Sequence, residues 1–394
     1  MSVPRLLRVG LDGRPLQPGF AGDGARGVGV YARELLAALA ARHDLVLTVW
    51  FDRARPVPDG VVPPGVRIRR YASPLPLGER LAAQFTVPLA AGERSHDVFH
   101  WLSHRYAPAL PPRGAVITVH DLLLERHPEW SPDAGSAGYR AARAIEASAL
   151  RRATVLVADT EDVRETLVAD HGVERARVSV APLGVHPRFA PVSAAEVAGL
   201  RKHLALDAPF VLHVGGLGPR KGVPLLFEAF ARARKRRRKH RLLLVLAGSA
   251  PDDPALAAVH EGAAELGIAD DLRVLPPLPL EHLARLLTAA RVFAVSSRAE
   301  GYGLPALEAM ACGTPVVSTT GGALGEVMGD AALLVAPGDL KGFATALERA
   351  AHDESVRARL IAAGRTRAAA HTWERTAEAT VAAYRAAVAL VRGA

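Results

Sequence analysis

The strongest constraint on the fold of this chain is an alternation of short apolar runs with amphipathic segments, which occurs twice along its 394 residues. In the first half, helical patterns at 30–41 and 136–152 separate strand-sized apolar runs at 6–11, 45–51, 98–101, 115–118 and 154–158. Strands that alternate with helices form a parallel sheet with both faces covered. The pattern therefore predicts an α/β fold.

The second half restarts the alternation after a proline-rich stretch at 182–191. Strands are predicted at 210–214, 242–247, 273–275, 292–296, 315–318 and 332–335. A single core rarely grows beyond about 250–300 residues. We therefore predict two doubly wound, Rossmann-like parallel-sheet domains, at 1–188 and 189–372, facing a cleft. The helix at 373–394 has no strand after it, so we expect it to pack back on the first domain.

Composition excludes several classes of protein. Apolar residues make up 49% and charged residues 23%, which is typical of a globular chain. No apolar run reaches the roughly 20 residues that cross a bilayer, and the first ten residues do not form a secretion signal. Cys312 is the single cysteine, which excludes an intramolecular disulfide and a cysteine-based zinc site. These features favour a cytoplasmic protein.

The net charge of +9 suggests an anionic partner, but a composition rich in alanine, arginine, glycine and proline gives such a charge without one. The arginine-rich run at 232–241 ends a predicted helix, where positive charge offsets the helix dipole. It also leaves open a peripheral contact with an anionic membrane, at its inner face. Nucleic acid is disfavoured because no aromatic residues are interleaved with the basic ones.

The most informative stretch reads Glu300-Gly-Tyr-Gly-Leu-Pro-Ala-Leu-Glu308. A predicted strand runs into a glycine-containing turn, and a helix begins near Leu304 with Pro305 in its first turn. The free N–H groups at such a helix start suit a diphosphate. Carboxylates accept hydrogen bonds from hydroxyls, so we expect Glu300 and Glu308 to bind sugar or ribose.

Two further motifs carry charge or backbone freedom. Gly215-Gly-Leu-Gly-Pro-Arg-Lys-Gly222 follows the strand at 210–214, and Arg220 with Lys221 supplies the charge that a diphosphate needs. In the first half, Gly27-Val-Gly29 is a glycine-rich loop before a helix, and His120-Asp121 follows the strand at 115–118.

Together these motifs resemble the E-x7-E signature and the accompanying elements of the retaining glycosyltransferases of family 4, which have the GT-B fold. The resemblance covers nearly the whole chain. It implies that Glu300 contacts the hydroxyls of the donor sugar, Glu308 the ribose, and Arg220 with Lys221 the diphosphate. It also implies that His120 reaches the donor sugar and that the donor is contacted at Gly29, Gly216, Pro277, Gly301, Tyr302, Gly303 and Leu304.

The implied activity is transfer of a hexose, with retention, from a nucleotide-diphosphate sugar to a saccharide or glycolipid, without a metal ion or a resident cofactor. The His-Asp-Leu context favours GDP-mannose as donor, with a UDP-sugar next. We hypothesise same-face attack, with His120 and nearby backbone supporting the oxocarbenium-like centre and Asp121 either orienting His120 or capping a turn.

Other interpretations stay open. Gly27 to Gly29, with Asp52 at the end of the next strand, half resembles a dinucleotide fingerprint, although residues 12–26 intervene and Ala32 takes the third glycine position. The segment 101–106 is either an acceptor-stacking surface or core. A sugar-nucleotide epimerase, a catalytically silent nucleotide-sugar-binding protein and a membrane-surface module are the rival functions.

Overall fold

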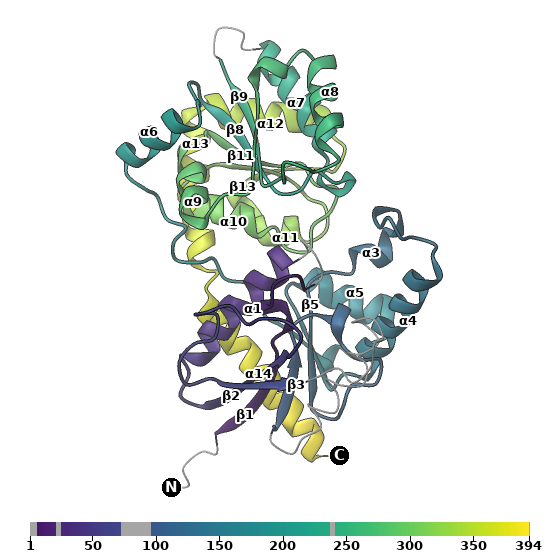
Figure 1. Cartoon of the computed structure of the whole chain (residues 1–394). Helices are drawn as coiled ribbons and strands as arrows, with labels where there is room; N and C mark the ends of the chain where they lie inside the picture. The colour runs from purple at the N-terminus through teal and green to yellow at the C-terminus, as the bar shows by residue number, and fades with distance from the viewer. Residues whose placement is uncertain (1–5, 21–24, 72–95, 237–240, 394) are drawn as a thin grey trace. The chain divides into compact units, whose positions relative to one another are not determined.

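The computed structural model describes residues 6–20, 25–71, 96–236 and 241–393. The chain divides into two compact units (Figure 1). The first comprises Met1–Gly184 with Trp373–Ala394, and the second comprises Val185–Thr372. Each unit is built on its own parallel sheet, which confirms the predicted fold class of two doubly wound α/β halves.

The first unit contains a seven-stranded sheet with the order β3-β2-β1-β4-β5-β6-β7. Its neighbouring strands pair in parallel, for example with Leu7 opposite Leu45 and Val116 opposite Val155. From β1 the chain adds strands first on one side and then, starting with β4, on the other. In open α/β sheets, ligands bind at the point where the strand order reverses in this way. The strands are β1 (Leu7–Asp12), β2 (Leu45–Asp52), β3 (Arg67–Tyr71), β4 (Val98–Trp101), β5 (Ala115–Val119), β6 (Val155–Ala158) and β7 (Val178–Val180).

Helices of this unit begin where short polar side chains cap them. Ser136 accepts a hydrogen bond from the amide of Tyr139, and Thr160 from that of Val163, while Gly172 ends its helix in the left-handed conformation. The elements are η1 (Arg14–Leu16), α1 (Ala25–Ala40), η3 (His104–Tyr106), α3 (Leu123–Arg126), η4 (Pro128–Trp130), α4 (Ala137–Arg152), α5 (Glu161–His171), η5 (Arg175–Arg177) and α14 (Trp373–Arg392).

Helix α14, yellow in Figure 1, packs against α1 and strands β4 to β7. Its Tyr384 is fully buried, and the Tyr384 hydroxyl lies 2.8 Å from Nδ1 of His100 on β4. Nε2 of His100 lies 2.7 Å from Oγ1 of Thr118 on β5, which in turn lies 2.8 Å from the hydroxyl of Tyr31 on α1. A buried hydrogen-bonded chain therefore ties α14 to two strands and to α1.

The second unit contains a six-stranded parallel sheet with the order β10-β9-β8-β11-β12-β13, which reverses between β8 and β11. Apolar side chains of its strands and helices, among them Phe230, Leu244 and Phe343, form its core. The strands are β8 (Phe210–Val214), β9 (Leu243–Ala247), β10 (Leu272–Leu275), β11 (Val292–Val295), β12 (Val316–Thr319) and β13 (Ala332–Val335).

Helices cover both faces of this sheet. They are α6 (Ala194–His203), α7 (Val223–Arg236), α8 (Leu256–Glu265), α9 (Leu280–Ala289), α10 (Leu304–Ala311), α11 (Leu324–Met328), α12 (Leu340–His352) and α13 (Glu354–Ala369), with η6 (Pro219–Lys221), η7 (Ala269–Asp271) and η8 (Gly329–Ala331) between them. In the described part of the chain, no helix is long and apolar enough to cross a membrane.

Two features differ from the sequence prediction. Strands β3 and β7 were not predicted, because β3 reads Arg-Ile-Arg-Arg-Tyr and is mostly exposed at the sheet edge, while β7 has only three residues. Gly27 and Gly29, predicted in a loop, lie inside α1, which begins at Ala25 rather than near Val30. The exposure of nearly every side chain of β3 removes the apolar signal on which strand prediction relies.

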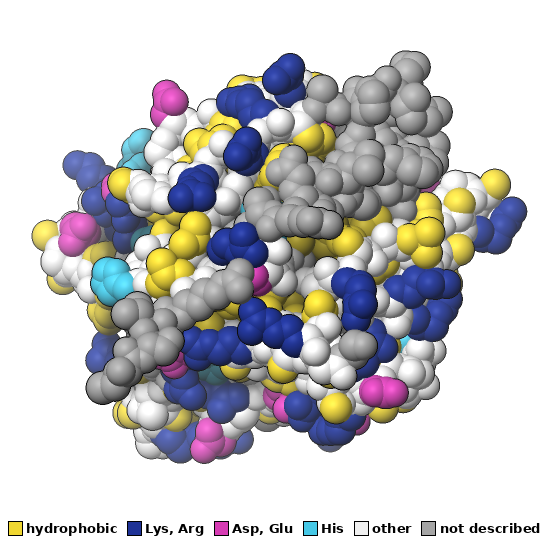
Figure 2. All heavy atoms as spheres, turned by 90° about the horizontal axis from the view of Figure 1, so that it is seen from below, with side chains coloured by type: hydrophobic (Ala, Val, Ile, Leu, Met, Phe, Trp, Pro, Cys, Tyr) yellow, Lys and Arg dark blue, Asp and Glu magenta, His cyan; other side chains and the backbone are white. Residues whose placement is uncertain are grey.

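Figure 2 shows one face of the molecule, on which lysine and arginine side chains are spread among neutral and apolar atoms with fewer acidic ones. This distribution agrees with the net charge of +9. The basic side chains on this face are dispersed, so the view by itself indicates no specific partner.

The buried hydrogen-bonded chain predicts a stability effect at α14. Replacing Tyr384→Phe leaves Nδ1 of His100 without its partner in a dry environment, which should cost about 1–3 kcal/mol. Thr118→Val removes the partner on the other side of the same ring. Because both changes act on His100, we expect their effects on thermal and urea unfolding to be non-additive. Additive losses would show that the two hydrogen bonds act independently.

Candidate active site

In the second unit, the loops that follow five neighbouring strands meet at the carboxyl edge of the sheet. Their order is set by the strand order: the loops after β10, β9, β8, β11 and β12. The loop after β8 contains Arg220 and Lys221, and the loop after β11 contains Glu300. These two loops flank the position where the strand order reverses, so the predicted charged residues lie at the switch point of the sheet.

Glu300 is held by both predicted basic residues. The Lys221 ammonium donates to Oε1 at 2.6 Å, and the Arg220 guanidinium donates to Oε2. The Ser297 hydroxyl donates to Oε1 at 2.6 Å. The structure therefore brings together three predicted site residues that are 79 and 80 positions apart in the chain.

This cluster of Arg220, Lys221 and Glu300 carries a net positive charge. Burial works against the charged form of Glu300, but attraction by Lys221 and Arg220 outweighs it, and the pKa falls from 4.5 to about 2. One carboxylate thus meets two cations, whose side chains are 32% (Arg220) and 20% (Lys221) exposed. A group with negative charge is the natural ligand for such a site.

Glycines allow these loops to approach one another. Gly222 has φ +63°, and a Cβ there would lie 2.1 Å from the carbonyl oxygen of Ser296. A Cβ on Gly321, in the loop after β12, would lie 2.0 Å from the carbonyl oxygen of Arg298. Both contacts press on the segment that leads to Glu300, so only glycine fits at these positions.

The glycine loop after β8 leaves room beside the cations. A Cβ on Gly215 would lie 3.5 Å from Cε and Nζ of Lys221, whereas a Cβ on Gly216 would meet nothing within 4 Å. Gly216 is exposed. This predicted residue therefore lies on an open surface directly beside the Lys221 ammonium.

The turn from Gly301 to Leu304 leads into α10, with Gly303 as its N-cap in the left-handed conformation at φ +91°. A Cβ on Gly303 would lie 2.6 Å from Leu324. Tyr302 is buried, and its hydroxyl bonds Nδ1 of His371 at 2.7 Å. Contact between this turn and a ligand is therefore left to backbone groups.

Glu308, five residues into α10, has the opposite electrostatics to Glu300. It is half-buried, and burial raises its pKa from 4.5 to about 8. No ion pair or hydrogen bond of its carboxyl group is found within the described residues. A carboxyl group that has lost water without gaining a protein partner suits a ligand that presents hydroxyls.

Pro277 lies in the exposed loop after β10. The amide of Gly248, after β9, donates to the carbonyl of Leu275 at 3.1 Å, and the amide of Gly215 donates to that of Ala247 at 2.9 Å. These bonds connect the loops in strand order. Two strand spacings, about 10 Å in all, separate the Pro277 loop from the Lys221 loop.

In the first unit, His120 lies at the carboxyl end of β5 with both ring nitrogens bonded. Nδ1 is 2.7 Å from Oδ2 of Asp159, and Nε2 is 2.9 Å from the carbonyl oxygen of Leu102. Tyr31 lies two residues after Gly29 on α1. The centroid of its ring is 4.6 Å from that of the His120 ring, and the two rings meet edge-on. The structure thus places the predicted Gly29 and His120 in one neighbourhood.

Comparison with known proteins identifies the family. Residues 25–189 match the model of Glycosyltransferase Family 4, and residues 200–367 match that of Glycosyl transferases group 1. The chain is 37% identical to a D-inositol 3-phosphate glycosyltransferase of Geodermatophilus obscurus, over 98% of this chain and 90% of that protein. This chain belongs to glycosyltransferase family 4.

Solved structures agree with this assignment. Sucrose-phosphate synthase from Thermosynechococcus elongatus superposes with a TM-score of 0.74 at 25% identity, covering 96% of this chain and 98% of the other. HepE of Anabaena, in complex with UDP and glucose, superposes with a TM-score of 0.71 at 18% identity, over 96% and 100%. The fold is GT-B, and the glycosyltransferase transfers a sugar from a nucleotide sugar.

Three other candidates are explained by local structure. Asp121 accepts from the amide of Leu123 at 3.2 Å, so it caps a turn, and Asp159 rather than Asp121 bonds His120. Asp52 likewise accepts from the amide of Ala54 at 2.9 Å. Trp101 is fully buried against Phe99 and belongs to the core. The sequence analysis missed Asp159 because this residue follows β6. Strand β6 lies beside β5 in the sheet but is separated from it along the chain.

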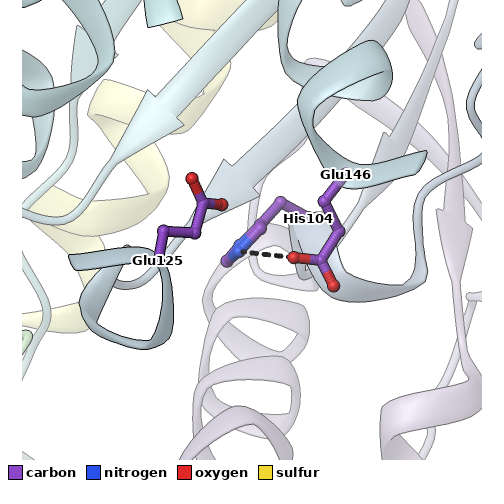
Figure 3. A group of neighbouring side chains, drawn as sticks. All are labelled: His104, Glu125 and Glu146. Carbon is purple, nitrogen blue, oxygen red and sulfur yellow. Dashed lines mark ion pairs between the residues drawn. The ribbon is translucent and has the colours of Figure 1, made fainter. Parts of the chain in front are cut away.

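The glycosyltransferase also contains an interior group of metal-ligand type, formed by His104, Glu125 and Glu146 (Figure 3). Arg143 donates to Glu146 at 2.6 Å, and Nε2 of His171 is 2.9 Å from Glu125. We call these five residues the His104 cluster. Its carboxylates are already paired with protein groups, so their negative charge does not call for a metal ion.

The described ends of the arginine-rich run are also paired. Arg234 lies 2.6 Å from Asp271, and Arg241 bonds Asp207. Residues 237–240 of the run lie outside the described residues. These two arginines are therefore paired with aspartates, and membrane contact of the run stays a hypothesis.

The two glutamates predict opposite effects of pH on the stability of the second unit. The folded pKa of Glu300 lies below its ordinary value, so the stability it contributes is present above pH 4.5 and is lost as the pH falls towards 2. We expect Glu300→Gln to lower the melting temperature at pH 7 and to differ little from the parent near pH 2.

Glu308→Gln should behave in the reverse manner. The folded pKa of Glu308 lies above its ordinary value, so its stabilising contribution is lost as the pH rises from 4.5 to about 8. We expect Glu308→Gln to melt higher than the parent at pH 9 and much the same at pH 4.5. The exposed Glu265→Gln is the matched control. Parallel pH profiles for all three variants would contradict both assignments.

Proposed function

We propose that this glycosyltransferase moves a hexose, with retention of anomeric configuration, from a nucleoside-diphosphate sugar to an acceptor hydroxyl without a divalent metal ion. The observation that carries the proposal is the cluster of Arg220, Lys221 and Glu300, in which two cations meet one carboxylate. The excess positive charge would balance the diphosphate as it departs, the task that a metal ion performs in other transferases.

The free donor groups of this cluster support the assignment. Arg220 uses one guanidinium nitrogen, Nη1, for Glu300 and the carbonyl of Ala299, and no other bond of its guanidinium is found among the described residues. Its remaining N–H groups can donate to phosphate oxygens, as can those of Lys221. The open surface at Gly216 provides the space that a diphosphate needs.

The two glutamates then have separate tasks. Glu300 is fixed in the charged form and orients towards hydroxyls of the donor sugar. Glu308 has no ionic partner within the described residues and would accept hydrogen bonds from the ribose hydroxyls. The Pro277 loop lies at about the distance that a nucleoside spans from the phosphate-binding residues. These positions support a donor that lies along the carboxyl edge of β10, β9 and β8.

For the donor, the His-Asp-Leu context keeps GDP-mannose as our first candidate and a UDP-sugar as the second. For the acceptor, the relatives add a third class to saccharides and glycolipids: proteins 31–37% identical to this chain are named D-inositol 3-phosphate glycosyltransferases. We therefore propose that a phosphorylated polyol be tested beside saccharide and glycolipid acceptors.

The experiment that tests the proposal is a thermal-shift panel of GDP, UDP, ADP and dTDP with and without EDTA, followed by transfer assays with the matching sugar nucleotides. A nucleotide that binds the folded state raises the melting temperature. An EDTA-insensitive shift and a product with retained configuration by NMR are expected. An inverted linkage, or strict dependence on a divalent ion, would contradict it. Turnover without any acceptor would favour an epimerase.

The phosphate assignment predicts a large kinetic effect. Lys221→Ala and Arg220→Ala should each slow transfer by about 100- to 1000-fold, as does the loss of a group that stabilises transition-state charge. The exposed Lys341→Ala serves as control and should retain normal rates. Near-normal turnover of both site variants, measured under saturating donor, would show that these residues do not act on the diphosphate.

A further inference from the structure

We infer that Asp159 holds His120 as an imidazolium cation, so that His120 acts in the transfer reaction as a fixed positive charge and not as a proton acceptor. This inference rests on the proposed function for its catalytic part. Its structural part, the positive charge of His120, rests on the contacts of this ring with Asp159 and Leu102. Asp159 is a positioning residue in this scheme, because it acts on the reaction only through His120.

The hydrogen-bond partners of His120 leave the ring no acceptor role. Nδ1 faces a carboxylate oxygen of Asp159 at 2.7 Å, and Nε2 faces the carbonyl oxygen of Leu102 at 2.9 Å. Neither a carboxylate nor a carbonyl donates a hydrogen bond. With Asp159 ionised, both ring nitrogens therefore carry a proton, and a histidine with two N–H groups is positively charged.

Burial raises the pKa of the Asp159 carboxyl, and the charge and hydrogen bond of the His120 ring act against that rise. The Asp159 side chain is only 2% exposed, and its Oδ1 atom has no hydrogen-bond partner in the described structure. Among the described residues, the His120 ring is the ionic partner of this carboxylate. An ionised carboxylate in the interior needs such a partner. Burial works against the charge on His120, but Asp159 outweighs it, and the pKa of His120 is raised.

The other titratable groups around His120 do not compete for its protons. His100 bonds Thr118 and Tyr384, and burial lowers its pKa to about 3. His104 is also buried, and its pKa is lowered well below the ordinary value. Asp121 is engaged by the amide of Leu123 and by Arg105 at 3.4 Å, and it adds to the attraction for a charged ring. The buried hydroxyl of Tyr31 bonds Thr118.

The second partner, the carbonyl of Leu102, belongs to a buried residue just before η3. In η3, His104 lies 3.9 Å from Glu146 of the His104 cluster, and Figure 3 shows these two side chains next to one another. The His120 ring thus has one protein acceptor at each of its two nitrogens.

A fixed cation changes the role expected of His120. A positive ring cannot support an oxocarbenium-like centre, which is itself positive, so the hypothesis drawn from the sequence needs correction on this point. The charge instead suits the departing phosphate or a hydroxyl oxygen of the donor sugar. The 16% exposed part of the ring is the surface available to such a group.

The first test is a pH titration of 15N-histidine-labelled full-length protein by NMR, with His120→Gln used to assign the His120 signals. We expect both His120 nitrogens to show protonated shifts from pH 6 to above pH 8, and Asp159→Asn to lose the second proton near or below neutral pH. The exposed Asp133→Asn is the control and should keep the wild-type His120 signals. A wild-type His120 that is neutral at pH 7 would overturn the inference.

The second test is the pH profile of kcat/KM. The wild-type value should be flat from pH 6 to 8, whereas that of Asp159→Asn should fall as the pH rises, with a loss of about tenfold or more at pH 8. Asp159→Glu should restore part of the flat profile. If kcat/KM of Asp159→Asn had the same pH dependence as that of the wild-type protein, the inference would also be overturned. Failure of the proposed function looks different, because wild-type protein would then transfer no sugar at any pH.

Discussion

The second unit depends on one interaction, the pairing of buried Glu300 with Lys221 and Arg220. A carboxylate removed from water is unstable without cations close by. Its partners come from the loop after β8, so the pairing connects the two loops that flank the reversal of strand order. The glycines at 222 and 321 are needed because the loops approach within van der Waals contact. The stability of this corner therefore rests on the same three side chains to which we assign the binding of the diphosphate.

The first unit uses a related device with the opposite balance of charge. His120 lies at the carboxyl end of β5, and Asp159 follows the neighbouring strand β6. The pair is neutral as a whole, whereas the cluster in the second unit keeps one positive charge in excess. We infer from this difference that the second unit supplies most of the affinity for a diphosphate, and that His120 contributes a directed charge at a position fixed by Asp159 and Leu102.

Much of the fold follows from local sequence signals. Strands β8 and β13 consist mainly of apolar residues, and their bounds match the predicted ones. Edge strand β3 could not be found in this way, because a strand with its arginines in water has no apolar pattern. The start of α1 was misjudged for a related reason: Gly27 and Gly29 are poor helix formers, yet the helix includes them. Packing outweighed propensity there.

The sequence by itself determined the family, the two parallel sheets and the charged motifs at Arg220, Lys221, Glu300 and Glu308, because these are contiguous patterns of residue types at fixed spacing. Only the tertiary structure decided which charges meet. It paired His120 with Asp159, 39 positions away, and left its neighbour in sequence, Asp121, to cap a turn. It also gave Glu300 two cations and Glu308 none among the described residues. Hydrogen bonds and ion pairs depend on distances across strands, and those distances are set only when the sheet has formed.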